Sequence, residues 1–283
     1  MKNIAILLTV FNRKEKTLAC LESIEQSGIT RIPSSFDIFL VDDGSTDGTA
    51  DAVKKQFPKV HLIEGTGNLF WNRGMHKAWQ EASKTKDYDF FMWMNDDTVL
   101  LANAINLLLE TSSQFSDHNI IVGSTCAMND SQIITYGGRK TDDQLIEPQD
   151  SPISCEFFNG NIVLIPRDVY QKVGMNDPFF HHALGDFDYG KRAAKLGVKS
   201  IVAPGVLGRC DEHESLSTWC DPQKPFSKRW KAFRSPLGQH PEEFFVYEKR
   251  HNGFLMACFH YFTNHLRVVW PQIWNQRNKA RFA

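Results

Sequence analysis

Apolar runs alternate with stretches of helical periodicity through the first 115 residues of the chain. Residues 4–11 (IAILLTVF) predict a buried strand, and residues 14–27 carry Leu18, Leu21 and Ile24 at helical spacing before Gly28. The same order then repeats, with strands expected at 36–43, 60–65 and 88–94 and helices at about 47–57, 70–83 and 102–115. Because the strands lack a polar face, the pattern predicts an α/β fold in which helices cover both faces of a mostly parallel sheet.

The pattern changes after residue 119. A strand beginning at Ile120 is followed by a hairpin-containing excursion at 134–148 and a strand-like run at 155–166. The remaining expected elements are a short helix from Pro166 to Gly174, a helix over 185–197 and a strand over 198–204. The sequence contains no internal repeat and no low-complexity segment.

Functional side chains follow the ends of three expected strands. Thr9, Phe11 and Arg13 lie at the end of the first strand, Asp42–Asp43 at the end of the second, and Asp96–Asp97 after the fourth. Because open α/β sheets bind ligands beyond the carboxyl ends of their strands, we expect these side chains to meet in one crevice.

The adjacent carboxylates Asp96 and Asp97 end an otherwise apolar run, FMWMNDDTVL (91–100). Two like charges side by side are costly unless a positive group lies near them, and a divalent cation is the most direct candidate. A solvated turn is the alternative. The expected convergence of three strand ends favours the cation site.

Composition indicates a globular protein whose cysteines are reduced. With 42% hydrophobic and 12% aromatic residues among 283, the chain can bury one large core or two modest ones. Its six cysteines are scattered without a C-x-x-C pair, and the N-terminal MKNIAILLTVFNRKEK reaches charged residues too early for a signal peptide. We therefore expect free thiols in a cytoplasmic protein.

Charge is distributed unevenly along the chain. Residues 223–283 contain eleven Lys and Arg against three Asp and Glu, which leaves 21 against 30 in residues 1–222. The surplus is about +8 in the C-terminal segment and about −9 in the rest. We expect one domain over 1–222 and a basic, aromatic, helical extension over 223–283 that meets an anionic partner.

Five motifs carry a resemblance to a known family. In chain order they are LLTVFNR (7–13), VDDGSTDGT (41–49), GNLFWNRGMHKAW (67–79), MNDDT (94–98) and GDFDYGKRAAKLG (185–197). Over residues 3–215 this ordered set resembles the family 2 glycosyltransferases, which have the GT-A fold. The resemblance implies a nucleotide-sugar donor, a Mg²⁺ or Mn²⁺ ion and inversion at the anomeric carbon, with residues 1–222 as the catalytic domain.

The resemblance also assigns residues to the donor side. Asp42 would bind the uracil or thymine edge, which favours a UDP- or dTDP-sugar, and Asp96 would reach the ribose or a metal-bound water. Arg73 would lie near a phosphate. The full nucleotide-sugar-binding set is Thr9, Phe11, Arg13, Asp42, Asp43, Asn68, Arg73 and Asp96.

Asp97 and His213 are the implied metal ligands. Asn95 stands where the family's D-x-D element has its first carboxylate, so one oxygen is kept and one charge is lost. A hard cation that keeps several waters and bridges diphosphate oxygens needs only one or two protein carboxylates, so this loss is tolerable. A lone His is more often structural, and His213 follows the VAP strand by nine residues.

Asp186 is the implied general base, because inversion requires a group that takes the proton of an attacking hydroxyl. Gly185 replaces the family's Glu beside it, and a helix N-cap is the alternative role for Asp186. Asp188 would orient the acceptor or cap the helix. The expected acceptor-binding residues are Asn159, Gly160, His182 and Asp188.

The C-terminal extension mixes aromatic and basic residues. Such segments lie in membrane interfaces and are drawn to anionic lipid, whereas a helical cap on the catalytic domain and a homodimer contact are the alternatives. Similar extensions in the family indicate a polyprenyl-diphosphate-linked glycan as acceptor and a place at the inner membrane surface in bacterial polysaccharide or lipopolysaccharide synthesis. The acidic catalytic part argues against nucleic acid as a partner.

Three rival classes fit parts of the pattern. A nucleotidyltransferase would need a Gly-rich phosphate loop near the first strand, and TVFNRKEK has no glycine. A phospho-acceptor receiver domain also pairs acids after a strand, but it is about half this length and would not need Asp186. A non-catalytic relative that binds nucleotide sugars is the third.

Overall fold

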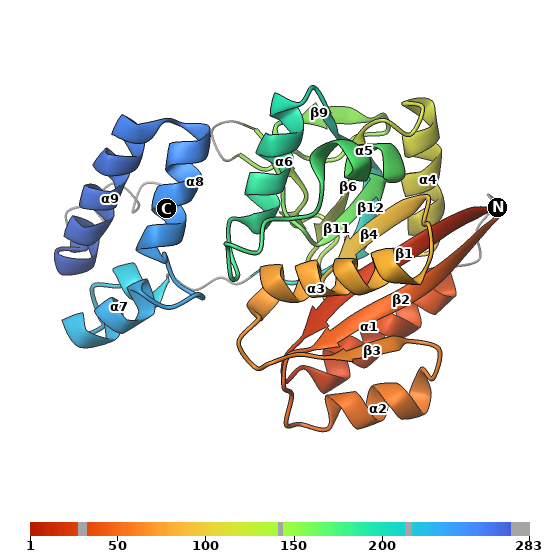
Figure 1. Cartoon of the computed structure of the whole chain (residues 1–283), viewed down its shortest axis with the longest axis horizontal. Coiled ribbons are helices and arrows are strands. Elements are labelled where there is room, and N and C mark those ends of the chain that lie inside the picture. Colours follow the sequence, from red (N-terminus) through yellow and green to blue (C-terminus); the bar gives the residue numbers. More distant parts are fainter. Residues whose placement is uncertain (28–32, 141–143, 213–216, 273–283) are drawn as a thin grey trace. The chain divides into compact units, whose positions relative to one another are not determined.

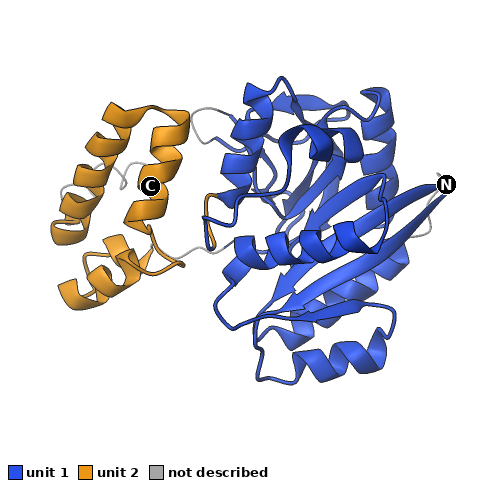
Figure 2. Cartoon of the chain, in the orientation of Figure 1, with its two compact units in different colours: residues 1–181, 185–212 blue, residues 182–184, 213–283 orange. Residues whose placement is uncertain are grey.

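The computed structural model describes residues 1–27, 33–140, 144–212 and 217–272. The chain forms two compact units: unit 1 comprises residues 1–181 and 185–212, and unit 2 comprises residues 182–184 and 213–283 (Figure 2). The contacts thus divide the chain after Glu212, ten residues before the charge boundary expected from the sequence.

Unit 1 is built on one large sheet (Figure 1). Its main path runs β3-β2-β1-β4-β11-β6-β12-β5, with β7 paired to β6 and β9 paired to β12, while β8 and β10 form a separate pair. The strands are β1 (Lys2–Val10), β2 (Ser34–Asp42), β3 (His61–Glu64), β4 (Phe90–Met94), β5 (Val99–Leu100), β6 (Ile120–Cys126), β7 (Ile134–Tyr136), β8 (Gly138–Arg139), β9 (Ile153–Cys155), β10 (Phe157–Phe158), β11 (Ile162–Pro166) and β12 (Ser200–Arg209).

Strand direction differs from a fully parallel sheet at one central position. β1 is parallel to β2 and β4, and β2 is parallel to β3, as expected. β11, however, is antiparallel to both of its neighbours, β4 and β6. The expected run at 155–166 is two strands, β10 and β11, separated by Asn159–Asn161. This break lies just beyond the end of β4, where Asn95 donates its N–H to the Asn161 carbonyl oxygen.

Helices cover both faces of the sheet. Every residue of β1 from Ile4 to Val10 is therefore buried. Alternate residues point to opposite cores: Ile4 and Ile6 pack with α1, α2 and α4, whereas Ala5 and Leu7 pack with α3, α5 and α6. The helices are α1 (Lys14–Ser27), α2 (Thr49–Gln56), α3 (Phe70–Thr85), α4 (Ala104–Gln114), α5 (Arg167–Val173) and α6 (Gly185–Lys195).

Unit 2 is helical, with its own small core. Its described elements are the 3-10 helix η1 (Thr218–Cys220), α7 (Phe226–Phe233), α8 (Pro241–His251) and α9 (Phe254–Val269). Trp219, Cys220, Phe233 and Val268 form the buried cluster, and the buried Arg229 donates through Nε to the Val268 carbonyl oxygen. Among the described residues, no helix combines the length and apolar character that crossing a bilayer requires.

Candidate active site

The three strand ends expected to converge are joined by side-chain contacts. Asn12, which follows β1, accepts the Thr46 N–H after β2 at 2.7 Å. Arg13, which follows β1, places its Nη1 2.8 Å from Asp97 Oδ2 and 3.3 Å from Asp96 Oδ1, beyond the end of β4. The Lys16 ammonium lies 4.0 Å from the same Asp97 oxygen. Both carboxylates are nearly buried, with 8% and 7% of their side chains exposed, so the positive groups stabilise charges that have lost most of their hydration.

Asp96 has one carboxylate oxygen without a hydrogen-bond partner among the described residues. This oxygen, Oδ2, is buried. Burial raises the pKa of Asp96 to about 7; Arg13 opposes this rise and the neighbouring Asp97 adds to it. An orphaned buried carboxylate oxygen is costly without a partner, and a hard divalent ion is a partner of the right chemistry.

Asp97 completes the oxygen pair. Its Oδ1 accepts the thiol of Cys210 at 3.6 Å, and burial, with Asp97 as a further cause, raises the pKa of Cys210 to about 12. The described residues contain no group of three or more His, Cys, Asp or Glu placed to hold a metal. Two carboxylates suit an ion that takes its other ligands from water and a diphosphate. His213 lies outside the described residues.

Asp42 and Asp43 end β2 with different surroundings. Asp42 accepts the Ser45 N–H at 2.8 Å through Oδ1, and no described residue donates to its Oδ2, which is compatible with the expected contact to a base. Asp43 instead accepts four backbone N–H groups, from Thr66 and Gly67 on Oδ1 and from Leu69 and Phe70 on Oδ2. Its carboxylate therefore holds the loop that leads into α3.

Replacing Asp43 with alanine is expected to lower the free energy of unfolding by roughly 3 kcal/mol or more, because four N–H donors lose a charged acceptor. Phe70 also depends on it, since this residue has a φ of 57° that a bulky side chain rarely adopts. Urea unfolding measures the loss. Glu25→Ala, at an exposed position of α1, should change stability by less than about 0.5 kcal/mol, and an equal loss in both variants would contradict the assignment.

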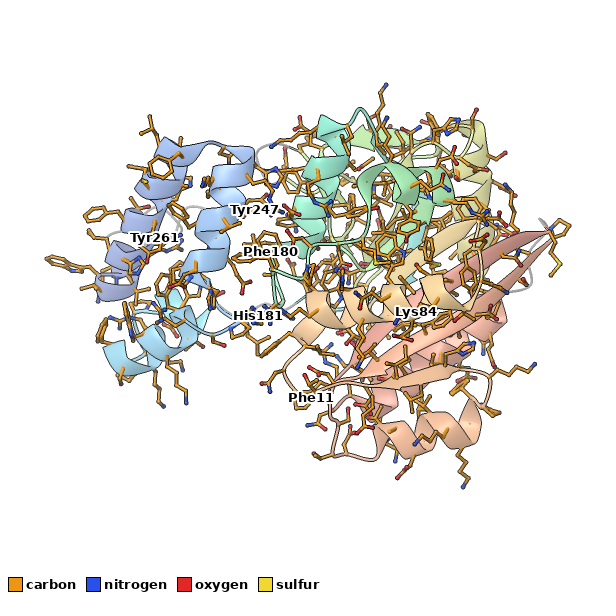
Figure 3. All side chains as sticks on the ribbon, in the orientation of Figure 1. Phe11, Lys84, Phe180, His181, Tyr247 and Tyr261 are labelled. Carbon is orange, nitrogen blue, oxygen red and sulfur yellow. The ribbon has the colours of Figure 1, made fainter. Side chains whose placement is uncertain are left out.

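The other expected donor-side residues are placed unequally. Phe11 follows β1 and is 55% exposed at the edge of the molecule (Figure 3), and Asn68 is also exposed. Thr9 is buried against Gly74 of α3, where a Cβ would have no room. Arg73 donates to the carbonyl oxygens of Pro178 and Phe179, at 2.9 and 3.3 Å, so its guanidinium ties α3 to the 178–179 segment.

Asp186 lies in the first turn of α6 and accepts two backbone N–H groups, from Gly160 on Oδ2 and from Phe187 on Oδ1, each at 2.9 Å. Burial raises the pKa of Asp186 to about 6, against the opposing effects of these two N–H groups and of Arg139. The carboxylate is consequently ionised at neutral pH but basic enough to accept a proton.

Trp71 connects Asp186 with the acidic pair. Its indole Nε1 donates to Asn95 Oδ1 at 2.7 Å, and its ring lies so close to Gly160 that a Cβ there would be 2.5 Å from two ring carbons. Gly160 in turn donates to Asp186. One half-buried side chain therefore touches both the 95–97 turn and the backbone that orients Asp186.

Substituting Gly160 with alanine is expected to cost roughly 1–3 kcal/mol of stability through overlap with Trp71. Because the overlapping atoms are the outer carbons of the indole, the same substitution should cost less than half as much when Trp71 is already phenylalanine. A double-mutant cycle measured by thermal unfolding tests this coupling. Additive effects of the two substitutions would show that the contact does not constrain Gly160.

Three of the expected acceptor-binding residues, Asn159, Gly160 and Asp188, lie in unit 1 and have different surroundings. Asn159 accepts Arg139 Nε at 2.8 Å, which places it near the Asp186 environment. Asp188 is fully buried and accepts Arg192 Nε at 2.8 Å, so its surroundings favour a structural role over contact with a ligand. His182 belongs to unit 2.

Sequence reasoning assigned no site role to Trp71, Arg139 or Cys210. Phe70, Trp71, Met75 and Trp79 have near-helical spacing, which predicts packing in the core, and Met75 and Trp79 are indeed fully buried. The polar partner of the indole, Asn95, is recognisable in the sequence because it replaces the first carboxylate of the D-x-D element. Arg139 and Cys210 gave no local signal, since each reaches the site through tertiary contacts.

Comparison with known proteins identifies the family. The family model described as "Glycosyl transferase family 2" matches residues 5–174, and the chain belongs to this family. A Mycobacterium tuberculosis protein named N-acetylglucosaminyl-diphospho-decaprenol L-rhamnosyltransferase is 22% identical over 227 residues, covering 69% of this chain and 72% of that protein. The teichoic acid poly(glycerol phosphate) polymerase of Staphylococcus epidermidis is 30% identical over 114 residues, covering 39% and 15%.

Solved structures confirm the GT-A type fold predicted from the motifs. The mannosyltransferase PcManGT from Pyrobaculum calidifontis, in complex with GDP-Man and Mn²⁺, superposes with a TM-score of 0.54 at 15% identity, covering 98% of this chain and 75% of that one. GalNAc-T7 with UDP, GalNAc and Mn²⁺ gives 0.55 at 15% identity, covering 91% and 56%. The expectation that the chain is a glycosyltransferase is confirmed by its family.

Proposed function

We propose that the chain transfers a sugar, with inversion, from a nucleoside-diphosphate donor to a lipid-linked glycan and depends on a divalent cation. The observation that carries the proposal is the chain of contacts through Trp71, which joins the Asp96–Asp97 pair to the Asp186 carboxylate. A leaving-group site and a general base on one edge of one sheet are the two parts that inverting transfer requires.

Asp97 and Asp96 are the residues that would hold Mg²⁺ or Mn²⁺. When bound, such an ion supplies positive charge that stabilises the departing diphosphate. Asp96 fits this role because one of its buried oxygens has no hydrogen-bond partner among the described residues. Asp97 fits because its carboxylate is nearly buried, although the Arg13 side chain now pairs with it. Two of the superposed structures were solved with Mn²⁺, which supports a divalent metal in this fold.

Asp186 would take the proton of the attacking hydroxyl. Its two backbone hydrogen bonds fix the carboxylate, and its pKa of about 6 leaves it ionised at neutral pH. Arg139, which lowers that pKa, would keep the base ionised before the acceptor arrives. The nucleotide is proposed to be UDP or dTDP, held at Asp42, whose Oδ2 accepts no hydrogen bond from a described residue.

The acceptor class rests on the relatives. The Mycobacterium tuberculosis relative carries a diphospho-decaprenol acceptor in its name, and it covers most of this chain. We therefore propose a polyprenyl-diphosphate-linked glycan as acceptor, in bacterial surface polysaccharide synthesis. Incubating the chain with a dTDP- or UDP-sugar and a short-chain polyprenyl-diphosphate glycan, with mass spectrometry of the lipid product, tests the proposal; a donor consumed without any lipid product would oppose this acceptor.

Replacing Arg13 with glutamine is expected to tighten Mn²⁺ binding in the absence of nucleotide by roughly tenfold, which corresponds to about 1.4 kcal/mol. The reason is that Arg13 bonds to both carboxylates and neutralises the charge that attracts the ion. Titration followed by the electron paramagnetic resonance signal of free Mn²⁺ gives the affinity. Lys14→Gln removes the same charge without an ion pair among the described residues, and an equal effect there would contradict a specific role for Arg13.

A further inference from the structure

One side of α9 carries large apolar side chains that the rest of the described structure leaves uncovered. Leu255, Phe259 and Phe262 are 83%, 61% and 68% exposed, and their spacing, continued by Leu266, places them on one face of the helix. The α9 apolar face, as the term is used below, consists of Phe254, Leu255, Cys258, Phe259, Phe262, Leu266 and Val269.

The opposite side of α9 is the side that packs. Ala257 and Val268 are fully buried, His260 Nδ1 lies 3.1 Å from Glu248 Oε2 of α8, and the Tyr261 ring lies edge-on to Phe245 at 5.7 Å. Figure 3 labels Tyr261 on α9 and Tyr247 on the neighbouring α8. The helix is thus held through a mixed side of small apolar, aromatic and polar residues. Of the apolar face, Phe254 contacts the Phe245 ring at 6.2 Å, whereas Leu255, Phe259 and Phe262 stay largely exposed in the described part of the chain.

The exposed charge of unit 2 is positive. Lys224, Lys228, Lys231 and Lys249 are exposed, and none of them pairs with a carboxylate within the described part of the chain. The acidic residues of α8 do not offset them, since Glu243 and Glu248 are buried and Glu242 pairs with Arg234 at 2.8 Å. Lys249 lies in the last turn of α8, which ends at His251, and the apolar face begins at Phe254, so a basic and an apolar group lie close in sequence at the α8–α9 turn.

We propose that the α9 apolar face and the lysines of unit 2 bind the surface of an anionic lipid bilayer, with α9 lying in the plane of the interface. Apolar side chains on one helix face beside exposed lysines are the combination that enters the headgroup region of anionic membranes. A second copy of unit 2 carries the same surplus of exposed lysines and so offers no complementary charge, whereas an anionic bilayer does. The inference rests on unit 2 alone and does not depend on the proposed transfer reaction.

Vesicle binding tests this surface directly. The full chain should sediment with phosphatidylcholine vesicles that contain phosphatidylglycerol at least about tenfold better than with phosphatidylcholine alone. The triple variant Leu255→Ser, Phe259→Ser, Phe262→Ser should lose at least about tenfold of this binding. The control variant Ile133→Ser, Leu196→Ser removes exposed apolar side chains from unit 1, which are 53% and 45% exposed, and should bind as the wild type does.

Cys258 offers a second measurement within the same face, because it is the exposed cysteine and the other five are buried or half-buried. A polarity-sensitive fluorophore attached to Cys258 should shift its emission to shorter wavelength when vesicles containing phosphatidylglycerol are added, and should not shift with phosphatidylcholine alone. Lys228→Glu, Lys231→Glu should weaken the preference for the anionic lipid at least about threefold.

The outcomes separate the alternatives. Circular dichroism and the Tm of the triple variant should match the wild type, since its substituted side chains are exposed and contribute little to folding. The proposal is overturned if the wild type ignores both vesicle types, or if the unit 1 control loses as much binding as the triple variant. It is also overturned if sedimentation velocity shows a dimer that the triple variant dissociates while vesicles bind neither protein, because a second copy would then cover the face.

Discussion

Replacing Asp97 with alanine is expected to lower kcat/KM for sugar transfer by roughly 10³-fold or more, which corresponds to about 4 kcal/mol of transition-state stabilisation. The substitution removes one of the two nearly buried carboxylates that would hold the cation and leaves Arg13 and Lys16 without their principal acceptor. Two positive side chains would then face the single carboxylate of Asp96, where a divalent ion has to bind. Donor affinity should consequently lose its dependence on Mn²⁺, as measured by isothermal titration with and without the ion.

The matched control for this substitution is Asp87→Ala. Both substitutions remove one carboxylate, so the change in net charge is the same. Asp87 is exposed in the loop before β4, at the opposite end of the strand from Asp97. Mn²⁺-dependent donor binding should persist in Asp87→Ala. If Asp97→Ala still binds the donor only in the presence of Mn²⁺, the ion is held elsewhere and the assignment of the acidic pair is wrong.

Replacing Asp186 with asparagine is expected to lower kcat by roughly 10²- to 10⁴-fold while leaving donor binding unchanged, because the amide cannot accept a proton. It also loses one of the two backbone N–H bonds, so some loss of stability accompanies the loss of kcat. The adjacent acid supplies a comparison. Asp188→Asn should mainly cost stability, since Asp188 is fully buried against Arg192. Rapid-quench kinetics and thermal unfolding of the two variants separate the roles, and a kcat loss in Asp188→Asn that matches that of Asp186→Asn would contradict the proposed base.

The pH dependence of the wild type follows from the same residue. Burial raises the pKa of Asp186 to about 6, and a general base must be ionised, so kcat should be constant above about pH 7 and fall tenfold per unit below about pH 6. The positive charge of Arg139 lowers this pKa, and Arg139→Gln should therefore move the acidic limb to higher pH. A limb that stays in place in Asp186→Asn would show that another group titrates.

Much of the fold could be predicted from periodicity. The helix expected at 14–27 is α1 with the same bounds, and the order of strands and helices up to residue 115 is as predicted except for the two-residue strand β5, which was not expected. The direction of β11 could not be predicted, because an apolar run such as IVLIP records burial and gives no information on direction. What fixes its antiparallel pairing with β4 is the path of the chain through Asn159–Asn161, where the Asn161 carbonyl oxygen accepts the N–H of Asn95.

The sequence predicts which residue types lie at the strand ends of the candidate site. It does not predict all the contacts that these residues make. Asp96 and Asp97 could be predicted because they end an apolar run, and Asp186 because its motif resembles the one in the family. The role of Asp43 in holding the loop before α3 could not be predicted. Its four N–H donors come from a loop whose conformation depends on glycines and on Phe70 in the left-handed region. The roles of Trp71 and Cys210 depend on contacts between residues 24 and 113 positions apart, which local pattern cannot report.

The measurement that tests the central claim most directly is release of nucleoside diphosphate from a panel of UDP-, dTDP- and GDP-sugars, with Mn²⁺ and with EDTA. The account predicts that one uridine or thymidine donor is turned over, that EDTA abolishes turnover, and that Mn²⁺ restores it in the wild type but not in Asp97→Ala. Turnover that continues in EDTA, or that survives in Asp97→Ala at the wild-type rate, would contradict a cation-dependent transfer at the acidic pair.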